Sequence, residues 1–150
     1  MSNTSRKWKH LLWITPLAVL AAGGIGMAAM MMKPPPADLD LSLSRTTENG
    51  LYHSSLEPAI SPVTVGAIHN WTVEVKTPDG APVDDATISI EGGMPQHGHG
   101  LPTSPRVTEA LGEGRYLIEG MKFNMPGWWT LTLHIDGSSG ADEATFNLSL

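Results

Sequence analysis

Alternation between apolar and polar residues runs through most of the chain after residue 48 and constrains its fold more than any other feature. In "IHNWTVEVK", every second residue falls on one face, which holds His69, Trp71, Val73 and Val75. Because successive side chains of a β-strand point to opposite faces, a period of two predicts a strand with one buried face. The pattern returns in "ATISIEG", "WWTLTLHID" and "ATFNLSL", whereas no convincing helical pattern follows residue 33.

The segments between these runs carry residues typical of tight turns. "TPDGAPV", "GEG" and "GSSG" place glycine, proline or aspartate where an antiparallel sheet reverses direction. We expect further strands in "GLYHSSLEP" and in residues 63–67, and "DLDLSLS" is compatible with a short one. The spacing predicts an all-β fold, an immunoglobulin-like antiparallel β-sandwich of about seven strands over residues 48–150. About 100 residues suffice to bury one core without disulfides, which this cysteine-free chain cannot form.

An uncharged apolar stretch precedes this domain. Residues 11–32 contain no charged side chain, and as a helix they would extend about 33 Å, enough to cross a membrane. We expect one transmembrane signal anchor there, with residues 1–10 as a basic cytoplasmic tail and residues 33–47 as a proline-rich linker. The alternative is a signal peptide cleaved near Gly26-Met27-Ala28. With either interpretation, we expect the rest of the chain to be exported from the cytoplasm.

The charges are divided unevenly between the two parts of the chain. Four of the nine basic residues and none of the 15 acidic residues precede residue 34, so the remainder carries a net charge of −10. Such an acidic domain is a poor candidate for binding nucleic acid. The sequence also lacks catalytic patterns such as HExxH or a phosphate-binding glycine motif, so we expect no enzyme activity.

Methionine and histidine residues are concentrated in two of the expected loops. "GGMPQHGHGLPTSP" contains Met94, His97 and His99, and "MKFNMPG" contains Met121 and Met125. One glycine separates the two histidines, so in an extended segment their side chains would point the same way. Thioether and imidazole groups together suit Cu(I), whereas methionine is a poor ligand for zinc. These five residues are candidate copper ligands.

Most of these residues also have a purely structural interpretation. Met121 is consistent with a core side chain, because methionine fills gaps well, and Met125 with a cap over the end of the sandwich. His69 is consistent with a hydrogen-bonded histidine of the inward face, and His134 has the parity of a surface residue. The histidine pair of the first loop is harder to explain, because a loop that only bends favours Asn, Asp or Ser.

Four motifs together resemble the FixH/YtkA-like family of bacterial exported proteins: "DGAPVDDA", "GGMPQHGHGLPT", "GEGRYLIEGMKF" and "MPGWW". The resemblance runs from about Gly50 to Leu150 and implies an immunoglobulin-like sandwich, often membrane-anchored, outside the bacterial cytoplasmic membrane. FixH is linked to the assembly of a haem-copper oxidase, and related CopC-type sandwiches bind copper. By position, the resemblance implies the same five candidate ligands.

Two functions are compatible with these observations. The first is a periplasmic, membrane-anchored copper-binding or copper-delivery protein, which would pass copper to an acceptor protein or assist assembly of a copper-containing respiratory complex. The second is a metal-free β-sandwich interaction module, an assembly or accessory factor for a membrane complex. Convergence of the histidine and methionine side chains on one point would favour copper. Diverging rings, or rings bonded to backbone carbonyls, would favour the second function.

Overall fold

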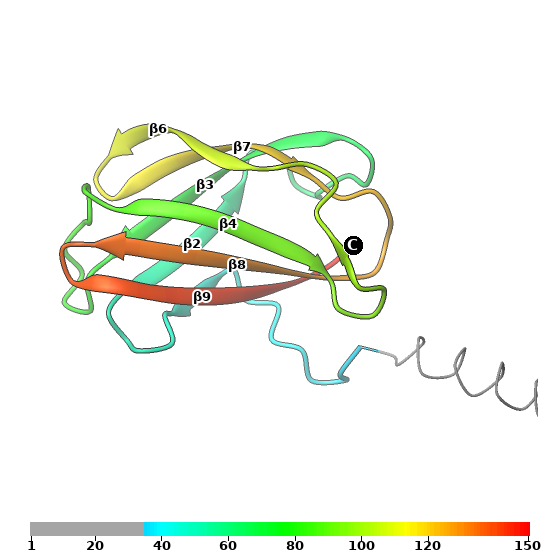
Figure 1. The fold of residues 1–150 in the computed structure, drawn as a ribbon, viewed down its shortest axis with the longest axis horizontal. Helices are drawn as coiled ribbons and strands as arrows, with labels where there is room; N and C mark the ends of the chain where they lie inside the picture. Colours follow the sequence, from blue (N-terminus) through cyan, green and yellow to red (C-terminus); the bar gives the residue numbers. More distant parts are fainter. Residues whose placement is uncertain (1–34) are drawn as a thin grey trace, which may run out of the picture. The chain divides into compact units, whose positions relative to one another are not determined.

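Nine β-strands and no helix make up residues 35–150, the part of the chain that the computed structural model describes (Figure 1). The first five strands are β1 (Ser44–Thr46), β2 (His53–Pro58), β3 (Ile68–Lys76), β4 (Thr87–Met94) and β5 (His99–Gly100). The last four are β6 (Arg106–Gly112), β7 (Arg115–Lys122), β8 (Trp128–Gly137) and β9 (Gly140–Ser149). The all-β prediction is therefore confirmed. The anchor expected at residues 11–32 lies outside the described part, within which no helix is long and apolar enough to span a membrane.

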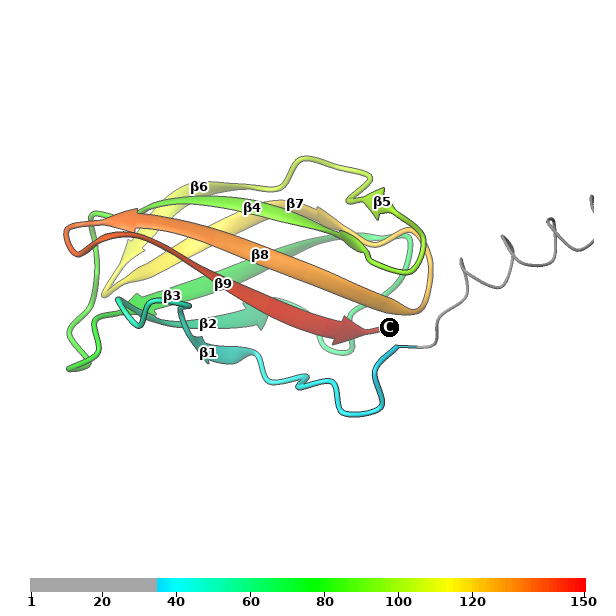
Figure 2. The same cartoon turned by 60° about the horizontal axis from the view of Figure 1, so that its bottom comes forward.

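The strands form two antiparallel sheets that pack face to face (Figure 2). The first sheet has the order β1-β2-β3-β7-β6, and the second has the order β5-β4-β8-β9. The order β2-β3-β7-β6 corresponds to strands ABED of an immunoglobulin domain, and β4-β8-β9 corresponds to CFG. β1 and β5 are additional edge strands.

The inward faces of β3 and β8 form the centre of the core, as the alternation predicts. Every second residue there has no exposed surface: Trp71, Val73 and Val75 on β3, and Trp129, Leu131, Leu133 and Ile135 on β8. Phe123 lies between the two tryptophans, with its ring centroid 6.4 Å from that of Trp71 and 5.3 Å from that of Trp129. This edge-to-face packing joins the two sheets near one end of the sandwich.

Two segments differ from the sequence-based expectation. Residues 63–67 do not form a strand, because Gly66 adopts a φ of +88° and its N–H donates to the Phe123 carbonyl oxygen (2.7 Å). The sandwich also has two short strands beyond the expected seven. β1 lies within the proline-rich segment 33–47, and β5 lies within the histidine loop. Strands of two or three residues are too short to produce a recognisable period in the sequence.

The loops that carry methionine and histidine meet at one end of the sandwich, which we call the histidine end. Residues 95–98 follow β4, residues 123–127 precede β8, and β9 terminates beside them (Figure 1). Gly127 and Leu150 exchange two backbone hydrogen bonds of 2.8 and 3.1 Å. The antiparallel order of the strands therefore brings loops that are far apart in the sequence to the same end.

Residues 35–150 contain a continuous hydrophobic core. These residues form one compact unit, and its core residues run from Tyr52 to Leu148. A compact unit with its own hydrophobic core has the properties of an independently folding domain. The fragment 35–150 is therefore a suitable protein for solution experiments.

Candidate functional site

The histidine loop is a tight reverse turn between β4 and β5. The N–H groups of His97 and Gly98 both donate to the carbonyl oxygen of Met94, at 3.1 and 3.0 Å. Gly98 has a φ of +65°, a left-handed conformation that glycine adopts without steric cost. We call the resulting structure, residues 93–100, the histidine hairpin.

The two imidazole rings lie parallel on the surface of this hairpin. The ring centroids of His97 and His99 are 6.0 Å apart, and the ring planes differ by 13°. Both residues are exposed, and neither ring has a hydrogen-bond partner within the described part of the chain. The rings are aligned as expected, but the cause is the turn at Gly98 rather than an extended backbone.

Met94 lies at the base of the hairpin, directly opposite His99 in the pairing of β4 with β5. Its side chain is buried, with an exposed fraction of 1%, and belongs to the core cluster. Its terminal methyl group reaches Gly127, where an added Cβ would lie 2.9 Å from Met94 Cε. The side chain of Met94 therefore connects the histidine hairpin to the 123–127 turn.

Met125 lies in this neighbouring turn and is half-buried against the core. Its carbonyl oxygen accepts a hydrogen bond from the indole N–H of Trp129 (3.0 Å), which attaches the turn to β8. Met94 contacts Gly127, which lies two residues after Met125. The thioethers of Met94 and Met125 therefore belong to neighbouring segments. The position of Met125 agrees both with a capping side chain and with a candidate ligand.

Met121 occupies a different environment in the first sheet. It has no exposed surface and lies opposite His69 in the pairing of β3 with β7. His69 is buried as well, and its Nε2 lies 2.7 Å from the carbonyl oxygen of Thr64. The structural interpretation of His69 as a hydrogen-bonded histidine is thus confirmed.

The histidine pair is not part of a larger cluster of imidazole and carboxylate groups in the described part of the chain. Among residues 35–150, no group of three or more His, Cys, Asp or Glu side chains is placed to hold a metal ion. The candidate ligands closest to His97 and His99 in the fold are the thioethers of Met94, at the base of the hairpin, and Met125, in the neighbouring turn. A donor set of imidazoles and thioethers is soft and fits Cu(I) rather than zinc.

His134, in contrast, belongs to the outer face of the second sheet. Its ring lies 3.0 Å from the carboxylate of Glu143 and 3.7 Å from that of Glu91, on the two adjacent strands. These cross-strand contacts confirm that His134 lies on the outward face of its strand, as its position in the alternating pattern predicts.

The sequence did not reveal an apolar groove at the histidine end. The groove is bordered by residues 41–43, residues 58–63 and residues 147–150, and has a cavity volume of about 400 Å³. The available signal was the alternation of "DLDLSLS", which places its leucines on one face. That signal could not show what the leucines pack against.

Together, the fold and its loops define a class: cysteine-free immunoglobulin-like sandwich domains with a surface histidine pair at one end. The chain belongs to the YtkA-like family, whose model matches residues 52–134. This confirms the resemblance noted from the motifs, and the matched range includes all five candidate ligands. A search of curated proteins found no match. The chain is also similar to a solved structure, the ZirS C-terminal domain, at 16% identity over 79% of this chain and 84% of that chain, with a TM-score of 0.38.

Proposed function

We propose that this protein is an exported, membrane-anchored copper-binding protein of the bacterial cell envelope that delivers Cu(I) to an acceptor. The observation that carries the proposal is the parallel, exposed histidine pair on a hairpin whose base is a methionine. Two imidazoles, with thioethers in the adjoining segments, provide ligands of the softness that Cu(I) prefers. No bond of a substrate is made or broken.

The exposure of the histidines suits delivery better than permanent storage. An acceptor can approach His97 and His99 directly, because both lie on the surface of the domain. Copper can then move by stepwise exchange of one ligand at a time. Met94 and Met125 adjoin the same loops, whereas Met121 lies inside the first sheet, so we expect the first two thioethers to contribute more.

A Cu(I) competition titration of residues 35–150 under anaerobic conditions tests this proposal. We expect one-to-one binding that competes with a colorimetric chelator. The double variant His97→Ala/His99→Ala should weaken it by at least about 100-fold, because even second-shell changes at metal sites cost about 10- to 100-fold. The matched control is His53→Ala/His134→Ala, which removes two histidines that lie outside the hairpin.

Thioether variants separate the remaining ligands. Met94→Leu and Met125→Leu keep volume and remove sulfur, and each should weaken Cu(I) binding by about tenfold. Met121→Leu should have a smaller effect. No binding to the fragment, or equal binding by the histidine double variant, would refute the copper site.

A metal-free interaction module is the second candidate function. It is supported by apolar side chains exposed near the histidine end, since Ile60 and Ile68 are 65% and 66% exposed. Exposed apolar residues near one another are typical of protein interaction sites. If Cu(I) fails to bind, cross-linking from position 60 or 68 in intact membranes becomes the informative experiment.

A further inference from the structure

The two ends of the sandwich differ in charge. At the histidine end, the loops that connect β2 to β3, β4 to β6 and β7 to β8 contain no Asp, Glu, Lys or Arg. The loops that connect strands at the opposite end, which we call the acidic end, contain no basic residue and five acidic ones: Glu48, Asp79, Asp84, Asp85 and Glu113. The negative charge of the loops is therefore confined to one end of the domain.

Exposed apolar side chains are concentrated at the uncharged end. Among residues 35–150, four large apolar side chains are exposed, and Leu41, Ile60 and Ile68 lie at the histidine end. The fourth, Leu111, lies on the edge strand β6 near the acidic end. The apolar groove described above adjoins Leu41 and continues the same surface. An exposed apolar surface of this kind is typical of a site that contacts a protein or a membrane.

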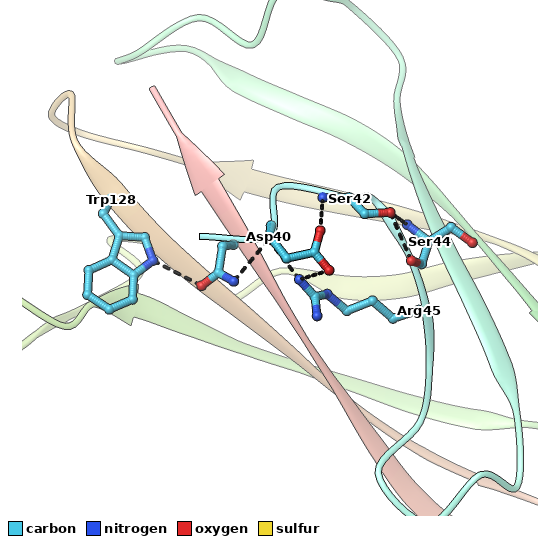
Figure 3. A network of polar contacts seen from close by, with 6 residues as sticks. Asp40, Ser42, Ser44, Arg45 and Trp128 are labelled. Atoms are coloured by element: carbon cyan, nitrogen blue, oxygen red, sulfur yellow. Dashed lines mark hydrogen bonds and ion pairs between the residues drawn. The ribbon is translucent and has the colours of Figure 1, made fainter. Parts of the chain in front are cut away.

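A strap, residues 40–43, extends this surface and is fastened to the sandwich. The main-chain oxygen of Asp40 accepts hydrogen bonds from the side chains of Asn147 (3.1 Å) and Arg45 (2.7 Å). Figure 3 shows these contacts together with the bond from Trp128 to the Asn147 amide oxygen. The Asp40 carboxylate also pairs with Arg45 at 3.2 Å. These contacts hold the strap against β9, and the ion pair compensates the one negative charge of the strap.

We propose that the histidine end docks on the surface of a lipid bilayer and inserts Ile60 and Ile68 between the lipids. A bilayer excludes charge over its whole plane, because a charge that leaves water for hydrocarbon loses its hydration. A protein partner imposes no such uniformity, since interfaces between proteins have a polar, solvent-accessible rim. The absence of charged side chains from all the connecting loops at this end therefore favours a bilayer.

The residues that flank these loops suit the headgroup layer of a membrane. The charged side chains nearest to the loops in sequence lie on the strands, at Glu57, Arg106 and Lys122. Long basic side chains can extend along an apolar surface and keep their charge in water. Trp128 begins β8 at the same end and is half-buried. Tryptophan combines an apolar ring with a polar N–H and is enriched where a membrane meets water.

The length of the N-terminal chain agrees with this orientation. Leu41 follows residue 32, the end of the expected membrane anchor, by nine positions. Nine extended residues span at most about 32 Å, so the anchor would keep the strap close to the membrane. Docking would also place His97 and His99 at the membrane surface. If the copper proposal holds, an acceptor embedded in the membrane is then favoured over a soluble one.

Partitioning of residues 35–150 onto lipid vesicles tests the surface without the N-terminal segment. We expect this fragment to co-float with phosphatidylcholine vesicles, which have no net charge to repel an acidic domain. Ile60→Ser/Ile68→Ser should lower the partition coefficient at least about tenfold, because binding to a membrane scales with the apolar area that is buried. The control is Leu111→Ser, which removes the exposed apolar side chain near the acidic end and should leave partitioning unchanged.

A fluorescent label tests the orientation of the docked domain. Because the chain has no cysteine, one introduced cysteine carries the label at a single position. Ala67→Cys lies beside Ile68, and Ser138→Cys lies in the turn between β8 and β9, and both native residues are exposed. Vesicles should shift the emission of a nitrobenzoxadiazole label at position 67 to shorter wavelength, and spin-labelled lipids should quench it. The label at position 138 should show neither effect.

Three results would overturn the proposal. The first is no co-flotation of the fragment at an excess of lipid, and the second is equal partitioning of the double serine variant. In both cases the exposed isoleucines would be assigned to a protein interface instead. The third is an equal response of the labels at positions 67 and 138, because the domain would then have no preferred orientation. Since these experiments use neither copper nor residues 1–34, their failure is distinct from failure of the proposed copper site or anchor.

Discussion

Asp142 shows how one buried charge organises a turn far away in the sequence. Its carboxylate accepts hydrogen bonds from the backbone N–H groups of Asn49, Leu51 and Glu143, at 2.9 to 3.1 Å, and from the Asn49 side chain at 2.9 Å. Burial alone would raise the pKa of Asp142. The hydrogen bonds from Thr47 and these N–H groups outweigh burial and hold the pKa well below its usual value.

We expect Asp142→Asn to lower the free energy of unfolding by about 2 kcal/mol at pH 7, because an amide cannot accept hydrogen bonds on both of its terminal atoms. The depressed pKa means that this stabilisation is complete above about pH 5. It is lost as the pH falls through the ordinary aspartate pKa of about 3.9 toward the lower folded value. Urea denaturation of both proteins between pH 3 and pH 7 measures the effect.

The control for this experiment is Asp136→Asn, which changes an exposed carboxylate one residue before the turn into β9. It should leave both the stability and its pH dependence nearly unchanged. Equal acid sensitivity of the wild type and Asp142→Asn would contradict the assigned role of Asp142.

At the scale of elements, the histidine hairpin depends on close backbone approach between β4 and β5. Gly93 pairs with Gly100, and Met94 pairs with His99. A Cβ on Gly93 would lie 2.2 Å from the carbonyl oxygen of His99, whereas a Cβ on Gly100 would meet nothing closer than 3.7 Å. The close contact with His99 requires a glycine at position 93, whereas position 100 has room for a larger residue.

We expect Gly93→Ala to destabilise the domain by about 2 kcal/mol, because the added methyl group forces the two strands apart. It should also weaken Cu(I) binding, although every candidate ligand is still present, because His99 moves away from His97. Gly100→Ala on the same hairpin should change neither quantity by much. Thermal unfolding and the Cu(I) titration measure the two effects. Unchanged copper affinity in Gly93→Ala would show that the hairpin geometry does not matter for binding.

At the scale of the whole molecule, we expect the sandwich and the N-terminal segment to have separate tasks. The described unit contains all nine strands, while the proposed membrane anchor lies at residues 11–32. The two parts also carry opposite charge, which agrees with a short basic tail in the cytoplasm and an acidic exported domain.

Removal of residues 1–34 should therefore leave a sandwich that unfolds cooperatively and should transfer the protein from the membrane to the soluble fraction. Fractionation of cells that produce the full chain or residues 35–150, with mass determination of the N-terminus, measures this. If cells that express the full gene contain a soluble protein whose N-terminus lies near Ala29, a signal peptide is cleaved instead.

The sequence by itself determined the β-sandwich and its inward faces. Alternation is a local property, because neighbouring side chains of a strand must face opposite sides, so Trp71 and Trp129 could be placed in the core without the fold. The residue preferences of turns, which are also local, identified the histidine pair as unusual. Only the tertiary structure decided which residues from distant segments meet. It placed Met94 against Gly127, Met121 opposite His69, and Leu41 and Leu43 along the same groove as the end of β9. These contacts depend on the order of strands in the two sheets and on the paths of the loops, and no local period in the sequence encodes either of them.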